Sequence, residues 1–230
     1  MMEHHWHLCE RDLFSGLAVE KQDFIAHAVK RYAPVNTFIF FQGDPADSTY
    51  YLESGEVRIC RINSWGKESI MFARKAGEMF GLAEIAGEGA NERECNAQAH
   101  TPCCLYEIKK EDFDLLMARH PALAKRVMGV LGRRLRYLCE QMENLMLCDV
   151  TTRLLKLLTY LNYQRLVDTG GYDEPISIPI SLTQEQIAAM IGSCQQTVSE
   201  ALKRLETQKM IQVSRKGITV LKPYDILARV

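Results

Sequence analysis

The spacing of hydrophobic and polar positions changes twice along this chain. Residues 10–32 place apolar side chains at helical intervals, so they predict a helix. Glycines then recur every 11 or 12 residues, at positions 43, 55, 66 and 77, between brief β-rich runs. Short strands separated by glycine turns predict an antiparallel sandwich or barrel. The predicted strands are 37–41, 49–52, 57–62, 69–72 and 103–108.

A long helix is predicted beyond residue 120. Pro121 suits the first turn of a helix, where its missing N–H costs nothing, and 122–147 contains no further proline. The apolar positions alternate steps of three and four with few breaks, which is typical of a coiled-coil seam. They are Val127, Val130, Leu131, Leu135, Leu138, Met142 and Leu145. We expect a second copy of the helix to cover this stripe, because one small β-domain cannot cover about seven turns; packing on the chain's own β-domain is the alternative.

The C-terminal part carries the spacing of a winged helix-turn-helix. Asp149 is expected to cap a helix that starts near residue 151, and 176–180 predicts an edge strand. Thr183 with Gln186 forms a capping-box pattern at the start of a helix over 183–191. Gly192 ends that helix, and Ser193 with Gln196 predicts a second capping box for a helix over 194–208. The runs 210–214 and 218–221 then predict a hairpin wing.

The start of the second of these helices is the predicted DNA-reading surface. Its leading residues would enter the major groove while its apolar face packs inward. Glutamine can pair with adenine, and Glu200 can accept a hydrogen bond from cytosine. Thr183, Lys203 and Lys216 suit contacts with phosphate. The predicted DNA-binding residues are Thr183, Gln195, Gln196, Thr197, Ser199, Glu200, Lys203 and Lys216. A merely solvated helix face is the alternative.

Charge and cysteine content refine this interpretation. The formal net charge of −1 argues against nucleic acid, but residues 182–222 hold six basic and three acidic side chains, a local charge of +3. The eight cysteines include no C-x-x-C pair, so we expect no structural zinc or other metal site, and thiols that are reduced and mostly buried. Inert buried thiols are also the simplest interpretation of Cys139 and Cys148. Without a membrane span or signal peptide, a cytoplasmic location is expected.

Together these segments resemble the Crp/Fnr superfamily of bacterial transcription regulators. The resemblance rests on LTQEQIAAMIGSCQQTVSEALKRLETQKMIQVSRKGITVL, on FQGDP with YYLESGEV, and on LGRRLRYLCEQMENLMLCDVTTRLLKLL. It implies an α+β fold with an N-terminal double-stranded β-helix, a jelly roll of the cyclic-nucleotide-binding type, over 1–120. A dimerisation helix over 121–148 and a winged helix-turn-helix over 149–230 would follow. It further implies a homodimer that binds a two-fold symmetric operator in double-stranded DNA, contacts RNA polymerase and responds to a small-molecule effector.

The chain departs from the family where ligands bind. The implied effector-pocket residues are Gly81, Leu82, Glu84, Arg93, Glu94, Leu138 and Met142. Members that bind cyclic nucleotide have glutamate where this chain has Leu82. They have serine or threonine after the arginine, where Glu94 follows Arg93 and would place a negative charge beside the expected phosphate. Cyclic-AMP binders also carry two hydroxyl residues at the positions of Leu138 and Cys139. A signal other than cyclic AMP is therefore favoured.

Other signals have weaker support in the sequence. The family's oxygen-sensing members hold an iron–sulfur cluster with several N-terminal cysteines, whereas only Cys9 lies near the N-terminus here. The family's carbon-monoxide-sensing members bind haem through a cysteine and a histidine, and this chain has Gly81 and Ala83 at those positions. His4, His5 and His7 beside Cys9 are most simply a terminus that binds nothing. The cofactor is thus unknown; a cyclic-nucleotide-binding regulatory module and a haem or redox sensor remain alternatives.

Two further expectations concern DNA and catalysis. The family's recognition helix usually carries E-x-x-S-R, where this chain has Gln196, Ser199 and Glu200. The operator should therefore differ at the position that the arginine reads. No enzymatic activity is expected, because a metal-dependent enzyme on a β-barrel needs clustered histidines and only His100 lies between Pro34 and Leu116.

Overall fold

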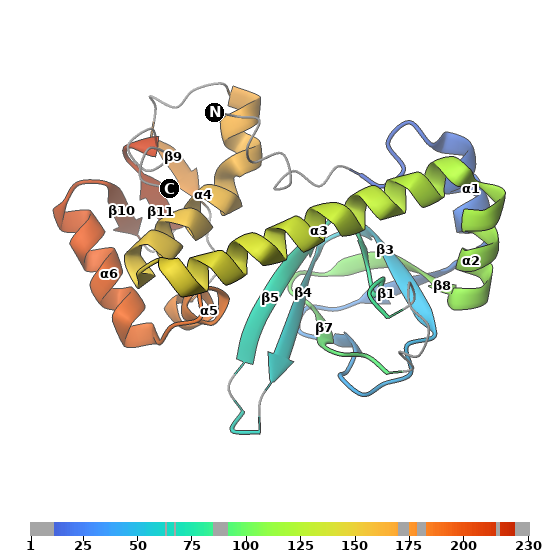
Figure 1. Ribbon diagram of the computed structural model, residues 1–230, viewed down its shortest axis with the longest axis horizontal. Coiled ribbons are helices and arrows are strands. Elements are labelled where there is room, and N and C mark those ends of the chain that lie inside the picture. The colour runs from blue at the N-terminus through green and yellow to red at the C-terminus, as the bar shows by residue number, and fades with distance from the viewer. Residues whose placement is uncertain are drawn as a thin grey trace. The chain divides into compact units, whose positions relative to one another are not determined.

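The computed structural model describes residues 12–62, 64–66, 68–84, 92–169, 175–178, 183–214 and 217–223. The chain divides into two compact units, one over 10–132 and one that includes 133–230. The division falls between Gly132 and Arg133, inside the long helix α3 (Pro121–Leu147), which is continuous in Figure 1. We describe each unit by itself.

The first unit is a double-sheet β-domain, as the sequence predicts (Figure 1). One four-stranded antiparallel sheet has the order β1-β8-β3-β6 and the other has the order β2-β7-β4-β5. The strands are β1 (Val29–Ala33), β2 (Phe38–Phe40), β3 (Ser48–Ser54), β4 (Glu56–Ile62), β5 (Glu68–Lys75), β6 (Met79–Phe80), β7 (Asn96–Ala99) and β8 (Cys103–Lys109). All four recurrent glycines have positive φ, which fits their predicted place in turns.

Several predicted boundaries need correction. The helix expected over 10–32 is shorter, because α1 covers only Ala18–His27 and residues 29–33 form β1, which pairs with β8. Four of the five residues of β1 are exposed, so the strand has no alternating apolar signal. Strands β6 and β7 were not predicted; β7 reads Asn-Ala-Gln-Ala, which are weak strand formers, and it forms by pairing with β2 and β4.

Two apolar clusters stabilise the β-domain. The first lies between the two sheets and includes Phe40, Leu52, Ile59 and Phe80. The second covers the outer face of the β1-β8-β3-β6 sheet, where α1, α2 (Lys110–Arg119) and the start of α3 meet β3 and β8. Its large members are Phe14, Phe24, Tyr51, Ile108, Phe113, Leu116, Leu123, Val127 and Val130. The helices therefore pack on the outer face of one sheet and, among the residues that the structure describes, contribute no side chain to the cluster between the two sheets.

Helix α3 begins at Pro121, as predicted, and its apolar stripe divides into two groups. Val127 and Val130 are buried in the second cluster, with Leu131 packed partly against it. Leu135, Leu138, Met142 and Leu145 are exposed, as is Met128, which the sequence interpretation did not include. Packing on the chain's own β-domain therefore accounts for the first group, and only the second group is free for another partner.

The second unit contains the expected helical and winged elements. Its helices after α3 are α4 (Val150–Thr169), α5 (Gln184–Met190) and α6 (Gln195–Thr207). Its small sheet has the order β10-β11-β9, from β10 (Ile211–Ser214), β11 (Gly217–Val220) and the predicted edge strand β9 (Ile176–Ile178). Asp149 caps α4 by accepting a hydrogen bond from the Thr152 N–H at 2.7 Å, as expected. Among the described residues, no helix is both long and apolar enough to span a membrane.

Candidate functional site

Helix α6 presents a polar face at its start and buries its other face. Val198, Leu202 and Leu205 are buried in a cluster shared with α4, α5 and the small sheet. Among the predicted DNA-binding residues, the exposed ones are Thr183, Gln195, Gln196, Glu200 and Lys203, whereas Thr197 and Ser199 are half-buried and Lys216 lies outside the described residues. The apolar periodicity of 194–208 thus orients the helix as the sequence predicts.

The predicted cap at the start of α5 is confirmed, and the predicted cap at the start of α6 is corrected. Thr183 Oγ1 accepts from the Gln186 N–H at 3.2 Å while the Gln186 side chain accepts from the Thr183 N–H, so the first capping box forms. The second capping box is wrong. The Ser193 N–H donates to Ala188 O and remains in the turn, and Cys194 is the residue that precedes α6.

Cys194 is exposed beside the predicted DNA-reading face. Its Sγ lies 3.1 Å from Thr197 Oγ1, and this contact, with the backbone N–H groups of the first turn, lowers the pKa of the thiol. Sequence reasoning did not single out Cys194, because the preceding Ser193 matches the capping-box pattern and cysteine is not a preferred N-cap residue.

Two predicted DNA-binding residues contact each other. Gln196 Nε2 donates to Glu200 Oε1 at 3.3 Å across one turn of α6. Both side chains are exposed, so the pair offers one amide oxygen and a carboxylate to an incoming partner. A carboxylate here repels phosphate but can accept a hydrogen bond from a cytosine amine.

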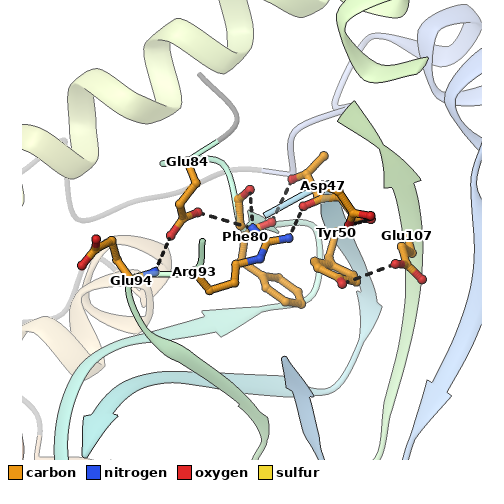
Figure 2. Close-up of polar contacts among 10 residues, drawn as sticks. Asp47, Tyr50, Phe80, Glu84, Arg93, Glu94 and Glu107 are labelled. Carbon is orange, nitrogen blue, oxygen red and sulfur yellow. Dashed lines mark hydrogen bonds and ion pairs between the residues drawn. The ribbon is translucent and has the colours of Figure 1, made fainter. Parts of the chain in front are cut away.

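The β-domain contains a second site, centred on a buried arginine (Figure 2). Arg93 is held by carbonyl groups: its Nη1 donates to Gly81 O at 3.3 Å and its Nη2 donates to Ser48 O. Its guanidinium carbon lies 4.4 Å from the centre of the Phe40 ring. Burial raises the pKa of neighbouring Tyr50 to about 12. These contacts define what we call the Arg93 site, formed by Arg93, Glu84, Gly81, Ser48, Phe40 and Tyr50.

The carboxylate beside Arg93 is Glu84 and not Glu94, whose charge was expected from the sequence to lie beside the phosphate position. Glu84 Oε2 lies 3.4 Å from Arg93 Nη1, and the two side chains are only 5% and 1% exposed. The other oxygen of Glu84 accepts from the Glu94 N–H at 3.3 Å. The Glu94 side chain is 74% exposed and pairs with Arg61. Figure 2 shows Glu84 between the Arg93 guanidinium and the Glu94 backbone.

The remaining predicted effector residues do not all meet at this site. The backbone of Gly81 is in close contact, since a Cβ there would lie 2.9 Å from Arg93 Nη1. Leu82 is buried in the other cluster, with Met79 and the helices. Leu138 and Met142 belong to the second unit and are exposed. Sequence reasoning missed Ser48, Phe40 and Tyr50, which come from β2 and β3 and carry no local signal for contact with residue 93.

The thiols are less uniformly buried than expected. Cys60, Cys103 and Cys104 are buried, and burial raises the pKa of Cys60 to about 12. Cys139, which we expected to be buried, is exposed on α3, because the adjacent stripe is uncovered within this chain. Cys148 is half-buried, and Cys9 with the three N-terminal histidines lies outside the described residues.

Both units match families of known proteins. Residues 30–120 match the cyclic nucleotide-binding domain, and residues 152–227 match the Crp-like helix-turn-helix domain. The chain is 30% identical to the cAMP-activated global transcriptional regulator CRP of Pasteurella multocida, over 86% of this chain and 92% of that protein. It is also 30% identical to the global nitrogen regulator of Nostoc sp., over 83% of this chain and 84% of that protein.

Solved structures agree with this relationship. The c-di-GMP-responsive global regulator CLP of Xanthomonas campestris has a TM-score of 0.75 and 25% identity, over 89% of this chain and 99% of that chain. A CRP/FNR family regulator of Thermus thermophilus shares the fold, with a TM-score of 0.70 and 20% identity, over 87% of this chain and 97% of that chain. The two matched domains and the relatives show that this chain belongs to the Crp/Fnr family and is a DNA-binding transcription regulator.

Proposed function

We propose that this chain is an effector-controlled regulator that binds a two-fold symmetric operator as a homodimer. The observation that carries the proposal is the arrangement of α6, whose leading residues Gln195, Gln196 and Glu200 are exposed while its apolar face is buried. A helix held in this way can place its first turns in the major groove. Lys203 and Thr183 are exposed and suit phosphate contacts, and Lys216 is proposed to add one from the wing.

The stripe of α3 supports the homodimer. Met128, Leu135 and Met142 recur every seven residues, and Leu138 and Leu145 follow Leu135 and Met142 at steps of three. This is the spacing of a two-stranded coiled coil, so we define these five residues, with half-buried Leu131, as the α3 seam. Pairing through the α3 seam would give the protein a two-fold axis. It would set the two recognition helices to read half-sites about 34 Å apart, in contact with RNA polymerase at a promoter.

The signal is proposed to be a small molecule that binds the β-domain and differs from cyclic AMP. The relative from Pasteurella multocida is named as cAMP-activated. In this chain Leu82 is part of an apolar cluster, so the position that carries a carboxylate in cyclic-nucleotide binders offers no polar group. The exposed Leu138 and Cys139 likewise offer an adenine ring no hydroxyl group.

Selection of binding sites from random DNA tests the proposal with the full-length protein. We expect a two-fold symmetric consensus that departs from the usual family half-site where arginine would read guanine, because Glu200 stands there. Gln195→Ala should weaken binding to the selected site about 5- to 150-fold, the equivalent of about 1–3 kcal/mol for one bidentate base contact. Gln208→Ala, an exposed glutamine at the other end of α6, is the matched control. Enrichment of no symmetric site, or equal loss in both variants, contradicts the proposal.

A further inference from the structure

We propose that Glu84 acts as an internal ligand of Arg93 and thereby restricts the β-domain to effectors without a phosphate group. This inference rests on the proposed function, because it assumes that the effector binds at the Arg93 site. Arg93 is the one residue of that site that could neutralise an anionic ligand. Its partner in this structure is a carboxylate of the same chain.

Burial strengthens the electrostatic interaction between Glu84 and Arg93. Both side chains are almost completely removed from water, at 1% and 5% exposure, so their charges interact through a medium of low polarity. A phosphate that approached Arg93 would bring a second negative charge to a guanidinium that Glu84 already neutralises. Two anions on one buried cation leave one of them uncompensated, which is costly away from water.

Hydrogen bonds hold the Glu84 carboxylate in place beside Arg93. One of its oxygens faces Arg93, and the other accepts from the Glu94 N–H, so both are engaged. The Arg93 guanidinium is fixed in the same way, because Nη1 also donates to Gly81 O at 3.3 Å and Nη2 donates to Ser48 O. Neither side chain can turn toward a ligand without breaking at least two of these contacts.

The other nearby carboxylate does not have this role. Glu94 follows Arg93 in sequence, yet its side chain is mostly exposed and paired with Arg61. Its charge is therefore screened by water and matched by its own cation. Glu94 thus provides a matched control, since it is also a glutamate close to Arg93 and differs in which cation it meets.

The test uses full-length protein. Isothermal titration calorimetry measures the binding of cyclic AMP, and the melting temperature reports the binding of inorganic phosphate. We expect Glu84→Gln and Glu84→Ala to bind cyclic AMP at least tenfold more tightly than the unmodified protein, and Glu94→Gln to match the unmodified protein. Adding Arg93→Met to Glu84→Gln should abolish the gain. Inorganic phosphate should raise the melting temperature of Glu84→Ala and leave that of the unmodified protein unchanged, because the anion replaces the missing carboxylate.

Two results overturn the inference. One is folded Glu84 variants that bind cyclic AMP no more tightly than the unmodified protein. The other result is binding of cyclic AMP by the unmodified protein at micromolar concentration. This measurement does not depend on the folding of any variant. Either result leaves the DNA-binding proposal intact if the selected operator is still bound. Loss of operator selection in the unmodified protein would instead contradict the proposed function.

Discussion

Leu135 offers the sharpest test of the α3 seam, because it is 64% exposed in the single chain and lies at the middle of the heptad-spaced positions. Complete burial of a leucine side chain contributes about 1.5–3 kcal/mol. Covering the exposed part of Leu135 therefore contributes about 1–2 kcal/mol. In a two-fold symmetric dimer each residue is present twice, so Leu135→Ala removes about 2–4 kcal/mol from the association free energy.

This loss translates into a measurable change in dimer affinity. Each 1.4 kcal/mol is a factor of ten, so the dissociation constant of the dimer should rise about 30- to several-hundred-fold. Sedimentation equilibrium over a range of protein concentrations measures it directly. The β-domain should keep its stability, because Leu135 is not part of either of its apolar clusters.

The matched control is Leu147→Ala, the same substitution on the same helix. Leu147 is 77% exposed and lies outside the heptad positions of the α3 seam, so its loss should leave the dissociation constant unchanged. Equal weakening in both variants would show that general apolar exposure, and not the seam, drives association. An unchanged dissociation constant for Leu135→Ala would refute the seam itself.

Three further predictions concern the second unit. Glu200→Arg should shift the selected operator toward guanine at one position of each half-site, by about 1–3 kcal/mol in fluorescence anisotropy titrations of matched duplexes; unchanged base preference would contradict this. Asp149→Ala should lower the free energy of unfolding in urea by about 1 kcal/mol at neutral pH. The Thr152 N–H lowers the pKa of Asp149 below 3.8, so this contribution is complete above pH 3.8, and the difference between the two proteins should vanish as the pH falls through the lowered value. Gly192→Ala should lower the melting temperature and cost about 1 kcal/mol or more, because φ is +64° and the new Cβ would lie 2.9 Å from Leu145 Cδ2; an unchanged melting temperature would contradict it.

Local sequence pattern predicts those elements whose signal lies within the element. The capping box at Thr183, the positive-φ turn glycines and the start of α3 at Pro121 each depend on residues a few positions apart, and each is confirmed. Strands β1 and β7 have no such signal. They form because β8, β2 and β4 offer unpaired edges from distant parts of the chain, and tertiary pairing outweighs weak local propensity.

The same distinction explains the error at the Arg93 site. Adjacency in sequence suggests that Glu94 is the carboxylate nearest to Arg93, but adjacency does not determine which way either side chain points. Arg93 follows the β-bridge between Glu92 and Pro45, and its side chain turns inward while that of Glu94 points to solvent. Glu84 contacts the guanidinium from another segment of the chain. The hydrophobic periodicity of either segment does not predict this contact.

Helix α3 shows why one apolar stripe cannot be assigned to one partner from sequence alone. The seven apolar positions, of which Val130 and Leu131 are adjacent, cover more of the helix surface than a coiled-coil seam requires. Val127 and Val130, on one side of the stripe, are buried in the β-domain, whereas Met128 is in phase with Leu135 and Met142 and stays exposed. Folding of the β-domain and association therefore depend on different residues of one helix. Helix α3 begins in the core of the β-domain and carries the exposed positions of the α3 seam beyond it, so one continuous element contributes to folding at its start and is available for association further along.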